Sequence, residues 1–405
     1  MAIRFSLICF LFVFYPITVE GDDPPGHGKP FGKHIPPVGE VPVLEDFPHP
    51  IEFYKRYVKP MKPVLFRGVL DRIKFPAYTK WTDEYLSKTF GNIMIEVEEG
   101  KKENRDFGME RMSLKKFLNI YKTKDIYLVN DLPMSMKADI NLPKCLLCGG
   151  FGDTLTKVIA WFSSGGTKSV LHNDEFDNIN CLLDGTKELI FINSDQEEAV
   201  MKDGWIEERG YSSMDVDSVD MYKYPAFRNI PWYSARMEKG DCLFIPNRWF
   251  HQVNSFGDRN LAVNIWFYPL SWFNRTDCAK GSGVNEEVSI NKYVLKNISE
   301  YARTLLLTTL PDADVISKEE FDEGWDEIIP NYNVKMEVFN NFDTDQDGLL
   351  SWKELYAFDL HDFVKTYKKN IGNDYMANYR RITDEMAELW AGSENDEITN
   401  TKEEL

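Results

Sequence analysis

The sequence predicts a mainly β protein with flanking helices, in which a double-sheet jelly roll precedes a smaller all-α module. Two observations predict this architecture. Residues 125–268 contain short apolar runs separated by Gly, Pro and Asp, without helical patterns between them, and such runs favour a jelly roll over a parallel α/β sheet. Residues 281–405 then change character, because helical patterns return and 27 acidic side chains outnumber 12 basic ones.

The uneven charge supports a division into domains. Of the net charge of −18, residues 281–405 carry −15 and residues 1–280 carry −3. A chain of this length is expected to form two or three domains. We predict a β domain over residues 43–272, an acidic helical module over 285–370 and an acidic tail over 371–405. So acidic a chain is a poor match for nucleic acid or an anionic membrane surface.

Residues 1–21 have the pattern of a signal peptide, with Arg4 before an apolar run and small residues before Asp22. The alternative is a membrane anchor, but the run is short and Pro16 interrupts it. No other stretch approaches 18 apolar residues, so no membrane span is expected in the mature chain.

Residues 22–42 are rich in Pro and Gly and predict an extended linker, in which His27 and His34 would be solvated. In the β domain, apolar runs bounded by turn residues predict strands at 63–68, 125–129, 242–245 and 261–268. Helical spacing predicts helices at 81–86, capped by Thr82, and at 113–121.

Two features of the central region depend on turn chemistry and composition. Residues 180–183 and 187–191 are predicted to form a hairpin, because Asp184-Gly185 is a strong turn signal. Residues 200–238 form an irregular insert rich in Tyr and acidic residues. We expect this insert at the mouth of the barrel, where it would contact a substrate.

Two histidines and one carboxylate form a candidate metal site. In an extended strand His172 and Asp174 project from the same face, and His251 follows 79 residues later. Two histidines and a carboxylate are the ligand set of a non-haem Fe(II) centre with open positions. The spacing alone also fits hydrogen-bonded residues inside a sheet, and about one H-x-[DE] tripeptide is expected by chance.

The surrounding pattern resembles the JmjC family of Fe(II)- and 2-oxoglutarate-dependent oxygenases, and is closest to its small members that hydroxylate protein side chains. The resemblance covers residues 43–272 and implies a double-stranded β-helix, a cupin-like jelly roll. The matching motifs are Ser169-x-x-His172-x-Asp174, Asn178, Gly185-x-Lys187, Gly240-Asp241-x-Leu243-x-x-Pro246, Trp249-x-His251 and Asn264-x-Trp266.

The resemblance implies a role for each matching residue. It makes His172, Asp174 and His251 the iron ligands. Lys187 would bind the distal carboxylate of 2-oxoglutarate. The hydroxyl of Tyr127 would join Lys187 at that carboxylate. The remaining positions, which would lie beside the cosubstrate or the metal, are Ser169, Asn178 and Asn264.

The lysine also makes physical sense inside a barrel. A buried lysine is costly without an anionic partner, and a dicarboxylate cosubstrate supplies one. The alternative is a lysine that is exposed on a strand.

The acidic module contains a twelve-residue loop with the pattern of an EF-hand, a calcium-binding helix–loop–helix. The loop runs from Asp343 to Glu354, with Gly348 at the sharp turn. The alternative is a solvated acidic turn. Helices are predicted at 334–341 and 352–367, and residues 311–321 would form a degenerate partner. The predicted calcium ligands are Asp343, Asp345, Asp347, Leu349 through its carbonyl, Ser351 through water, and Glu354.

Several signals indicate the lumen of the endoplasmic reticulum. The last four residues, Lys402 to Leu405, resemble the K-D-E-L class that a retrieval receptor recognises. Asn274 and Asn297 begin N-glycosylation tripeptides. Five cysteines remain after the signal. We predict a local disulfide between Cys145 and Cys148, which leaves at least one cysteine free or paired between chains.

These features predict a lumenal oxygenase that uses Fe(II) and 2-oxoglutarate, hydroxylates a side chain of a secretory-pathway protein, and binds calcium. One alternative is a non-catalytic calcium-binding lumenal protein with a JmjC-like recognition domain, which the intact ligand set disfavours. A second is a cupin-like metal enzyme that does not use 2-oxoglutarate, which Lys187 and Tyr127 disfavour.

Overall fold

The structure is a computed structural model. It describes residues 23–380 except 104–108, 207–209, 271–272, 276–277, 279–286, 296–302, 304–305, 308, 312, 314 and 378. The predicted signal peptide, the sequon at Asn297, and the tail from residue 381 to the K-D-E-L-like end therefore lie outside the described residues.

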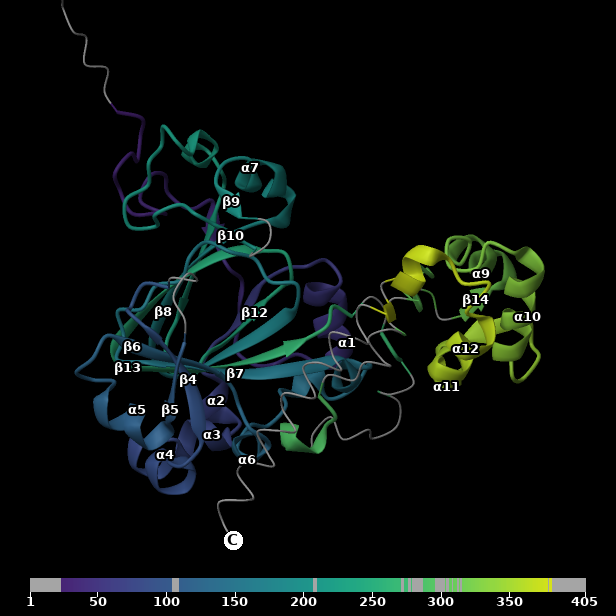
Figure 1. The fold of residues 1–405 in the computed structure, drawn as a ribbon, viewed down its shortest axis with the longest axis horizontal. Coiled ribbons are helices and arrows are strands. Elements are labelled where there is room, and N and C mark those ends of the chain that lie inside the picture. Colours follow the sequence, from purple (N-terminus) through teal and green to yellow (C-terminus); the bar gives the residue numbers. More distant parts are fainter. Residues whose placement is uncertain are drawn as a thin grey trace, which may run out of the picture.

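The described part of the β domain is built on a mixed sheet of 11 strands, which Figure 1 shows curving around a common interior. The β1–β11 and β2–β3 pairs are parallel, and the other pairs are antiparallel. The strands are β1 Gly39–Glu40, β2 Val43–Leu44, β3 Val64–Phe66, β4 Met94–Glu99, β5 Glu110–Ser113, β6 Ile126–Asp131, β7 Leu155–Ser163, β8 Asp177–Ile192, β11 Tyr233–Met237, β12 Cys242–Ile245 and β13 Phe250–Phe267. The predicted mainly β class is confirmed for this domain.

Strands β8 and β13 are the longest and pair with each other along most of their length. The first half of β8 also pairs with β12, and its second half pairs with β11. The predicted hairpin at Asp184-Gly185 is wrong, because the chain continues through Gly185 as one bent strand. Gly185 has a φ of +85° and faces a register shift in β13 between Phe256 and Leu261, so the glycine serves a bulge.

The helices between residues 69 and 137 lie on one side of this sheet (Figure 1), and the predicted helix starts at Thr82 and Ser113 are confirmed. Thr82 accepts a hydrogen bond from Tyr85 N, and Ser113 accepts one from Lys116 N. The apolar faces of the helices that follow Thr82 and Ser113 join the same core as Phe162 of the sheet. The helices are α1 Pro50–Phe53, the π-helix η1 Tyr54–Val58, α2 Val69–Arg72, α3 Pro76–Lys80, α4 Asp83–Phe90, α5 Leu114–Ile120, α6 Met134–Lys137 and α7 Glu197–Met201, with short 3₁₀ turns η2 Lys144–Leu146, η3 Phe151–Thr154, η4 Ser194–Gln196, η6 Pro225–Arg228 and η7 Ile290–Lys292.

The insert and the N-terminal segment pack together, so the prediction of an extended linker is wrong for residues 23–42. Gly28 N and Phe31 N donate to the carbonyls of Val219 and Val216. Buried apolar residues of both segments form one cluster that continues onto the sheet through Phe250. We call residues 23–38 and 194–232 the accessory lobe; it includes β9 Trp205–Ile206 paired with β10 Tyr211–Ser212.

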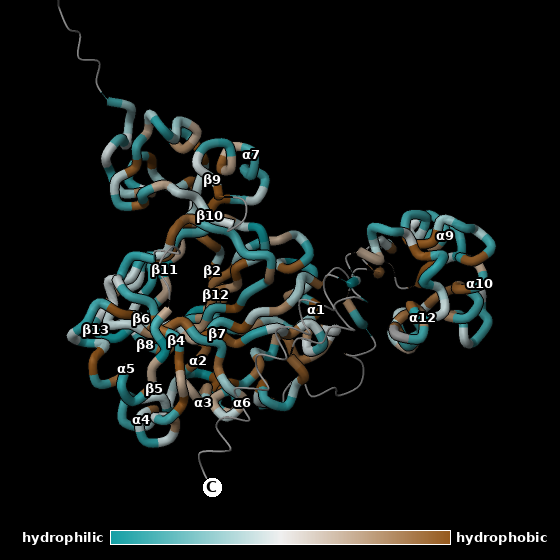
Figure 2. The backbone as a smooth tube through the Cα atoms, in the orientation of Figure 1, coloured by the Kyte–Doolittle hydropathy of each residue, from teal (hydrophilic) through white to brown (hydrophobic). Residues whose placement is uncertain are grey.

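The two histidines predicted to be solvated lie in this lobe. His27 accepts a hydrogen bond from Met221 N, and His34 stacks on Phe31 with a centroid distance of 5.7 Å. The apolar residues between the Pro and Gly positions, above all Phe31, anchor the segment. Figure 2 shows hydrophobic stretches in the lobe as well as along the sheet.

The disulfides differ from the predicted local pair. Cys148 bonds to Cys278, Cys181 bonds to Cys242, and Cys145 is a buried free thiol. Cys181 and Cys242 are direct partners in the register of β8 and β12, so strand pairing decides this bond. Cys145 lies in the 3₁₀ turn η2, where burial raises its pKa well above the usual value.

The C-terminal module includes the helices α9 Lys318–Gly324, α10 Tyr332–Phe342, α11 Trp352–Ala357 and α12 Leu360–Tyr367. Strands β14 Val315–Ser317 and β15 Leu349–Ser351 pair between the two helical halves. The predicted helix 352–367 is broken, because Phe358 is extended and Asp359 caps α12.

The N-terminal boundary of this module lies later in the sequence than the predicted residue 285. Val288 O accepts a hydrogen bond from Leu142 N, and Ile290 N donates to Ile140 O, so residues 288–290 pack on the β domain. None of the helices in the described ranges combines the length and apolar character needed to cross a lipid bilayer.

Candidate metal centre and cosubstrate pocket

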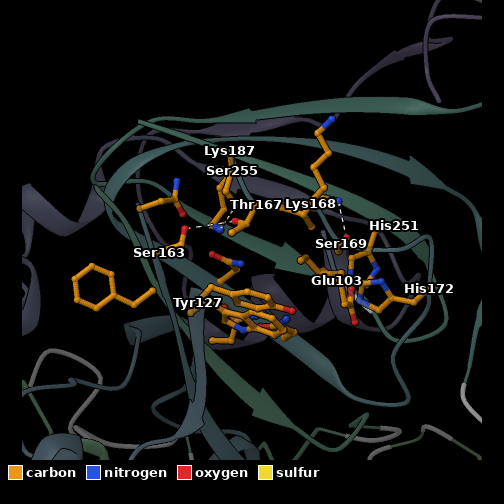
Figure 3. A pocket seen from close by; sticks show the side chains of 18 of the residues that line it. Glu103, Tyr127, Ser163, Thr167, Lys168, Ser169, His172, Lys187, His251 and Ser255 are labelled. Carbon is orange, nitrogen blue, oxygen red and sulfur yellow. Dashed lines mark hydrogen bonds between the residues drawn. The ribbon is translucent and has the colours of Figure 1, made fainter. Parts of the chain in front are cut away.

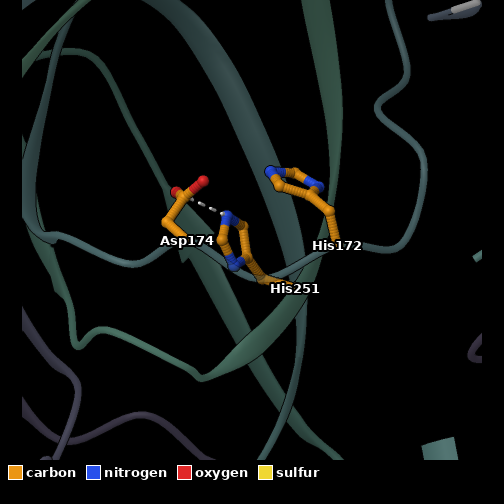
Figure 4. A group of neighbouring side chains, drawn as sticks. All are labelled: His172, Asp174 and His251. Carbon is orange, nitrogen blue, oxygen red and sulfur yellow. Dashed lines mark ion pairs between the residues drawn. The ribbon is translucent and has the colours of Figure 1, made fainter. Parts of the chain in front are cut away.

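His172, Asp174 and His251 converge at one point, as Figure 4 shows. Each offers a ligand atom, and these atoms lie within 4.8 Å of one another. His251 Nε2 is 3.7 Å from Asp174 Oδ2. The fold therefore brings His251 to His172 and Asp174, although His251 lies 79 residues after His172 in the sequence.

Backbone pairing places the two histidines side by side. His172 N donates to His251 O at 3.1 Å, and His251 N donates to His172 O at 2.7 Å. On its other side, the His172 segment pairs with β10 of the accessory lobe, because Ser212 N donates to Leu171 O at 2.8 Å. The ligand segment is thus held between β13 and the insert.

The ring orientations suit a divalent metal. The Nδ1 atom of His172 lies 2.9 Å from Val170 O, and the Nδ1 atom of His251 lies 3.0 Å from Trp249 O. Bonding of Nδ1–H to a carbonyl fixes the tautomer and leaves Nε2 as the ligand atom. Two imidazoles and one carboxylate on one side of a metal leave its other positions open, so the donor set fits Fe(II).

These ligands line a pocket of about 140 Å³ inside the β domain. Figure 3 shows His172 and His251 on one side of it and Lys187 and Ser255 on the other. Every pocket residue that the sequence suggested lies in its wall: His172, Asp174, His251, Lys187, Tyr127, Ser169, Asn178 and Asn264.

Lys187 is a buried lysine of this pocket. Its side chain is buried, and its Nζ donates to Ser255 Oγ at 2.8 Å. No carboxylate is paired with it among the residues that the structure describes. Burial lowers the pKa of Lys187 to about 7, because the protonated form loses its hydration. An anionic ligand in the pocket would supply the missing partner, so the site fits a carboxylate compound such as 2-oxoglutarate.

Several buried polar atoms of the pocket wall lack a hydrogen-bond partner within the described ranges. They are the side-chain oxygens of Asn178, Asn180 and Asn264 and the indole nitrogens of Trp161 and Trp266. Buried polar groups normally have partners, so these atoms indicate a pocket that is completed by polar ligands or water.

Two predicted cosubstrate residues have protein partners here. Ser169 Oγ accepts a hydrogen bond from Val253 N at 2.8 Å. The Tyr127 hydroxyl donates to Glu98, and its ring stacks on Trp161. Contact of either side chain with a cosubstrate stays a prediction.

Sequence reasoning missed Ser255 and Asn180. Both lie on the pocket face of a strand, at an even spacing from a predicted residue: Ser255 is four residues after His251, and Asn180 is two after Asn178. The alternation of β-strands is the signal that could have found them.

The predicted calcium loop follows α10 and leads into α11. Oxygen atoms of Asp343, Asp345 and Glu354 lie within 4.8 Å of one another. Asp347 instead accepts a hydrogen bond from Leu349 N, and Ser351 caps α11. Asn274 N donates to Gly149 O, which places this sequon beside the β domain.

Comparison with known proteins places this geometry in context. Residues 50–272 match the family model described as a Cupin-like domain. Over 226 residues the chain is 28% identical to lysine-specific demethylase 8 of Xenopus tropicalis, covering 53% of this chain and 50% of that protein. The chain thus spans about half the length of this relative.

Two human proteins match over more of their length. Identity to the bifunctional peptidase and (3S)-lysyl hydroxylase JMJD7 is 24% over 298 residues, or 60% of this chain and 91% of that protein. Identity to tRNA wybutosine-synthesizing protein 5 is 25% over 279 residues, or 61% and 82%. The family model ends at residue 272, before the C-terminal module.

Proposed function

Because the chain belongs to the family of proteins with a Cupin-like domain, we propose that it is an Fe(II)- and 2-oxoglutarate-dependent oxygenase of the JmjC type. The observation that carries the proposal is the placement of three metal ligands on one side of a pocket and a buried lysine on the other. The lysyl hydroxylase among its relatives supports the same reaction class. We propose further that the substrate is a side chain of a secretory-pathway protein.

Each part of the pocket has a task in this reaction. His172, Asp174 and His251 hold the metal, and the Lys187 ammonium pairs with the distal carboxylate of the cosubstrate. Iron bound there supplies the oxidising chemistry, by which oxygen and 2-oxoglutarate give succinate, carbon dioxide and a hydroxylated C–H position. The walls, which include Phe162, Val253 and Trp266, limit the access of water to the reacting groups.

A turnover assay tests the proposal. The mature chain is supplied with Fe(II), oxygen, 2-oxoglutarate and fractions of lumenal protein, and succinate is measured. We expect succinate formation to depend on the metal and to increase when the added fraction contains the substrate. Equal succinate from metal-replete and chelator-treated protein, across all fractions, would contradict the proposal.

We propose the lumen of the endoplasmic reticulum as the site of action. The signal-like start and the K-D-E-L-like end support this location. The two disulfides support an oxidising compartment, because such bonds are rare in proteins of the cytosol.

We also propose that the loop from Asp343 to Glu354 is an EF-hand that binds calcium. Its support is the convergence of three carboxylates within a helix–loop–helix whose strand pairs with a second loop. Glu354→Gln is expected to weaken calcium binding by at least about tenfold, because a neutral amide replaces the carboxylate at the closing position. Titration calorimetry with calcium measures this change.

Glu320 provides a matched control for Glu354. Both glutamates occupy the third position of a helix and complete a capping box with a serine, but Glu320 is not part of the acidic cluster. Glu320→Gln should leave calcium affinity unchanged, since glutamine also completes a capping box. Equal affinities of the wild type and Glu354→Gln would refute the calcium site.

A further inference from the structure

Asp177 is a buried carboxylate three residues after the ligand Asp174, outside the ligand set and the pocket wall. It is the first residue of β8 and only 1% exposed. Its Oδ1 accepts two hydrogen bonds from Asn247, one from the backbone N at 2.9 Å and one from Nδ2 at 3.0 Å. No lysine or arginine pairs with it in the described part of the chain. A buried carboxylate held by one amide residue is costly, so its position needs an explanation.

Asn247, which donates both hydrogen bonds to Asp177, is the first residue of the turn before His251. Strand β12 ends at Ile245, whose register partner is Asn178 of β8, so Asn247 leaves β12 close to the first residue of β8. The next residue, Arg248, has a φ of +61°, which non-glycine residues adopt only when their surroundings impose it. The Asp177–Asn247 pair therefore lies at the entry to a strained turn.

This turn contacts both segments that carry metal ligands. Arg248 N donates to Asp174 O at 2.7 Å. The carbonyl of Trp249 lies 3.0 Å from the Nδ1 atom of His251. A shift of the turn would move the Asp174 backbone and release the His251 ring together.

We propose that Asp177 is a positioning residue that clamps Asn247 and, through the 247–249 turn, sets the geometry of Asp174 and His251. The inference rests on the metal centre of the proposed function. Asp177 is not itself a metal ligand. It acts on the ligands through the hydrogen bonds that its Oδ1 accepts from Asn247, and its negative charge is not required.

Metal affinity without turnover tests this inference. Titration calorimetry with Mn(II), a redox-stable stand-in for Fe(II), is performed on the full chain. Asp177→Leu removes the acceptor at similar volume, and we expect Mn(II) affinity to fall by about tenfold or more, as for other residues that orient metal ligands. Asp177→Asn keeps an oxygen for Asn247 and is expected to retain wild-type affinity.

Two further variants keep the test decisive. Asn247→Ala removes one of the two bonds from the other side and should also weaken Mn(II) binding, even if Asp177→Leu fails to fold. Asp139→Leu is the matched control, because Asp139 is equally a buried carboxylate but bonds to Lys80, Trp81 and Tyr85 on the helical side. It should leave Mn(II) affinity unchanged.

The outcomes separate this inference from the proposed function. Equal affinity of the wild type and Asn247→Ala overturns the clamp. A loss in Asp139→Leu as large as in Asp177→Leu also overturns it, as does a loss in Asp177→Asn as large as in Asp177→Leu. A wild-type chain that binds no Mn(II) instead overturns the metal centre itself, and the clamp with it.

Discussion

His172→Ala is expected to reduce succinate formation to the level of chelator-treated protein, a loss of more than about 100-fold. Loss of a residue that only orients a ligand costs 10- to 100-fold in metal affinity or activity, and His172 contributes one of three protein ligands itself. Alanine leaves two ligands and opens the site to water. Succinate is measured at saturating 2-oxoglutarate and equal Fe(II), and Mn(II) titration reports the loss of binding directly.

His34→Ala is the control for this variant. His34 stacks on Phe31 in the accessory lobe and does not line the pocket, so its loss should leave succinate formation intact. Comparable succinate from His172→Ala and the wild type would refute the assignment of the metal site.

The affinity for 2-oxoglutarate is expected to fall as pH rises above 7. Burial lowers the pKa of Lys187 in the free protein to about 7, and the carboxylate of a bound ligand favours the ammonium and raises that pKa. Above pH 7 the free lysine is mostly neutral, so binding must take up a proton. The affinity should therefore fall by up to about tenfold per pH unit. Well below pH 7 the lysine is charged in both states, and this dependence disappears.

Calorimetry on Mn(II)-loaded protein between pH 6 and 9 measures this effect, and buffers of different ionisation enthalpy report the proton uptake. Lys187→Arg keeps its charge over the whole range and should flatten the profile, whereas Lys187→Met should bind weakly at every pH. Lys137→Met removes another buried lysine, whose Nζ lies 3.0 Å from Asp131 Oδ1 and which does not line the pocket. This variant should retain the wild-type profile. A wild-type affinity that is independent of pH, and equal to that of Lys187→Met, would contradict the role of Lys187.

The sequence predicted the pocket better than the chain path around it. His172 and Asp174 are two residues apart, but spacing alone did not decide their role; the motifs that carry Lys187 and His251 resemble the JmjC family, and this resemblance grouped the four residues. Ser255 escaped because a serine on a strand carries no motif. Its contact with Lys187 depends on the register of β13 against β8, which one strand alone does not reveal.

The errors share a physical cause, which is that distant partners decided the local structure. Asp184-Gly185 is a hairpin signal, yet β13 runs alongside both halves of β8 and keeps the chain in one strand. The segment from residue 23 to 42 has the composition of a linker. Phe31 nevertheless packs in one apolar cluster with residues of the 200–238 insert, which follow almost 200 positions later in the chain. Cys148 likewise bonds to Cys278 in preference to its neighbour.

The two disulfides are nested, and this has a consequence for the integrity of the active region. The Cys148–Cys278 bond closes a covalent ring of chain that contains His172, Asp174 and His251, and the Cys181–Cys242 bond closes a smaller ring within it that contains Lys187. A single proteolytic cut anywhere inside the larger ring leaves both fragments joined. The metal ligands and the lysine would therefore stay on one covalent molecule after such a cut, and separate only upon reduction.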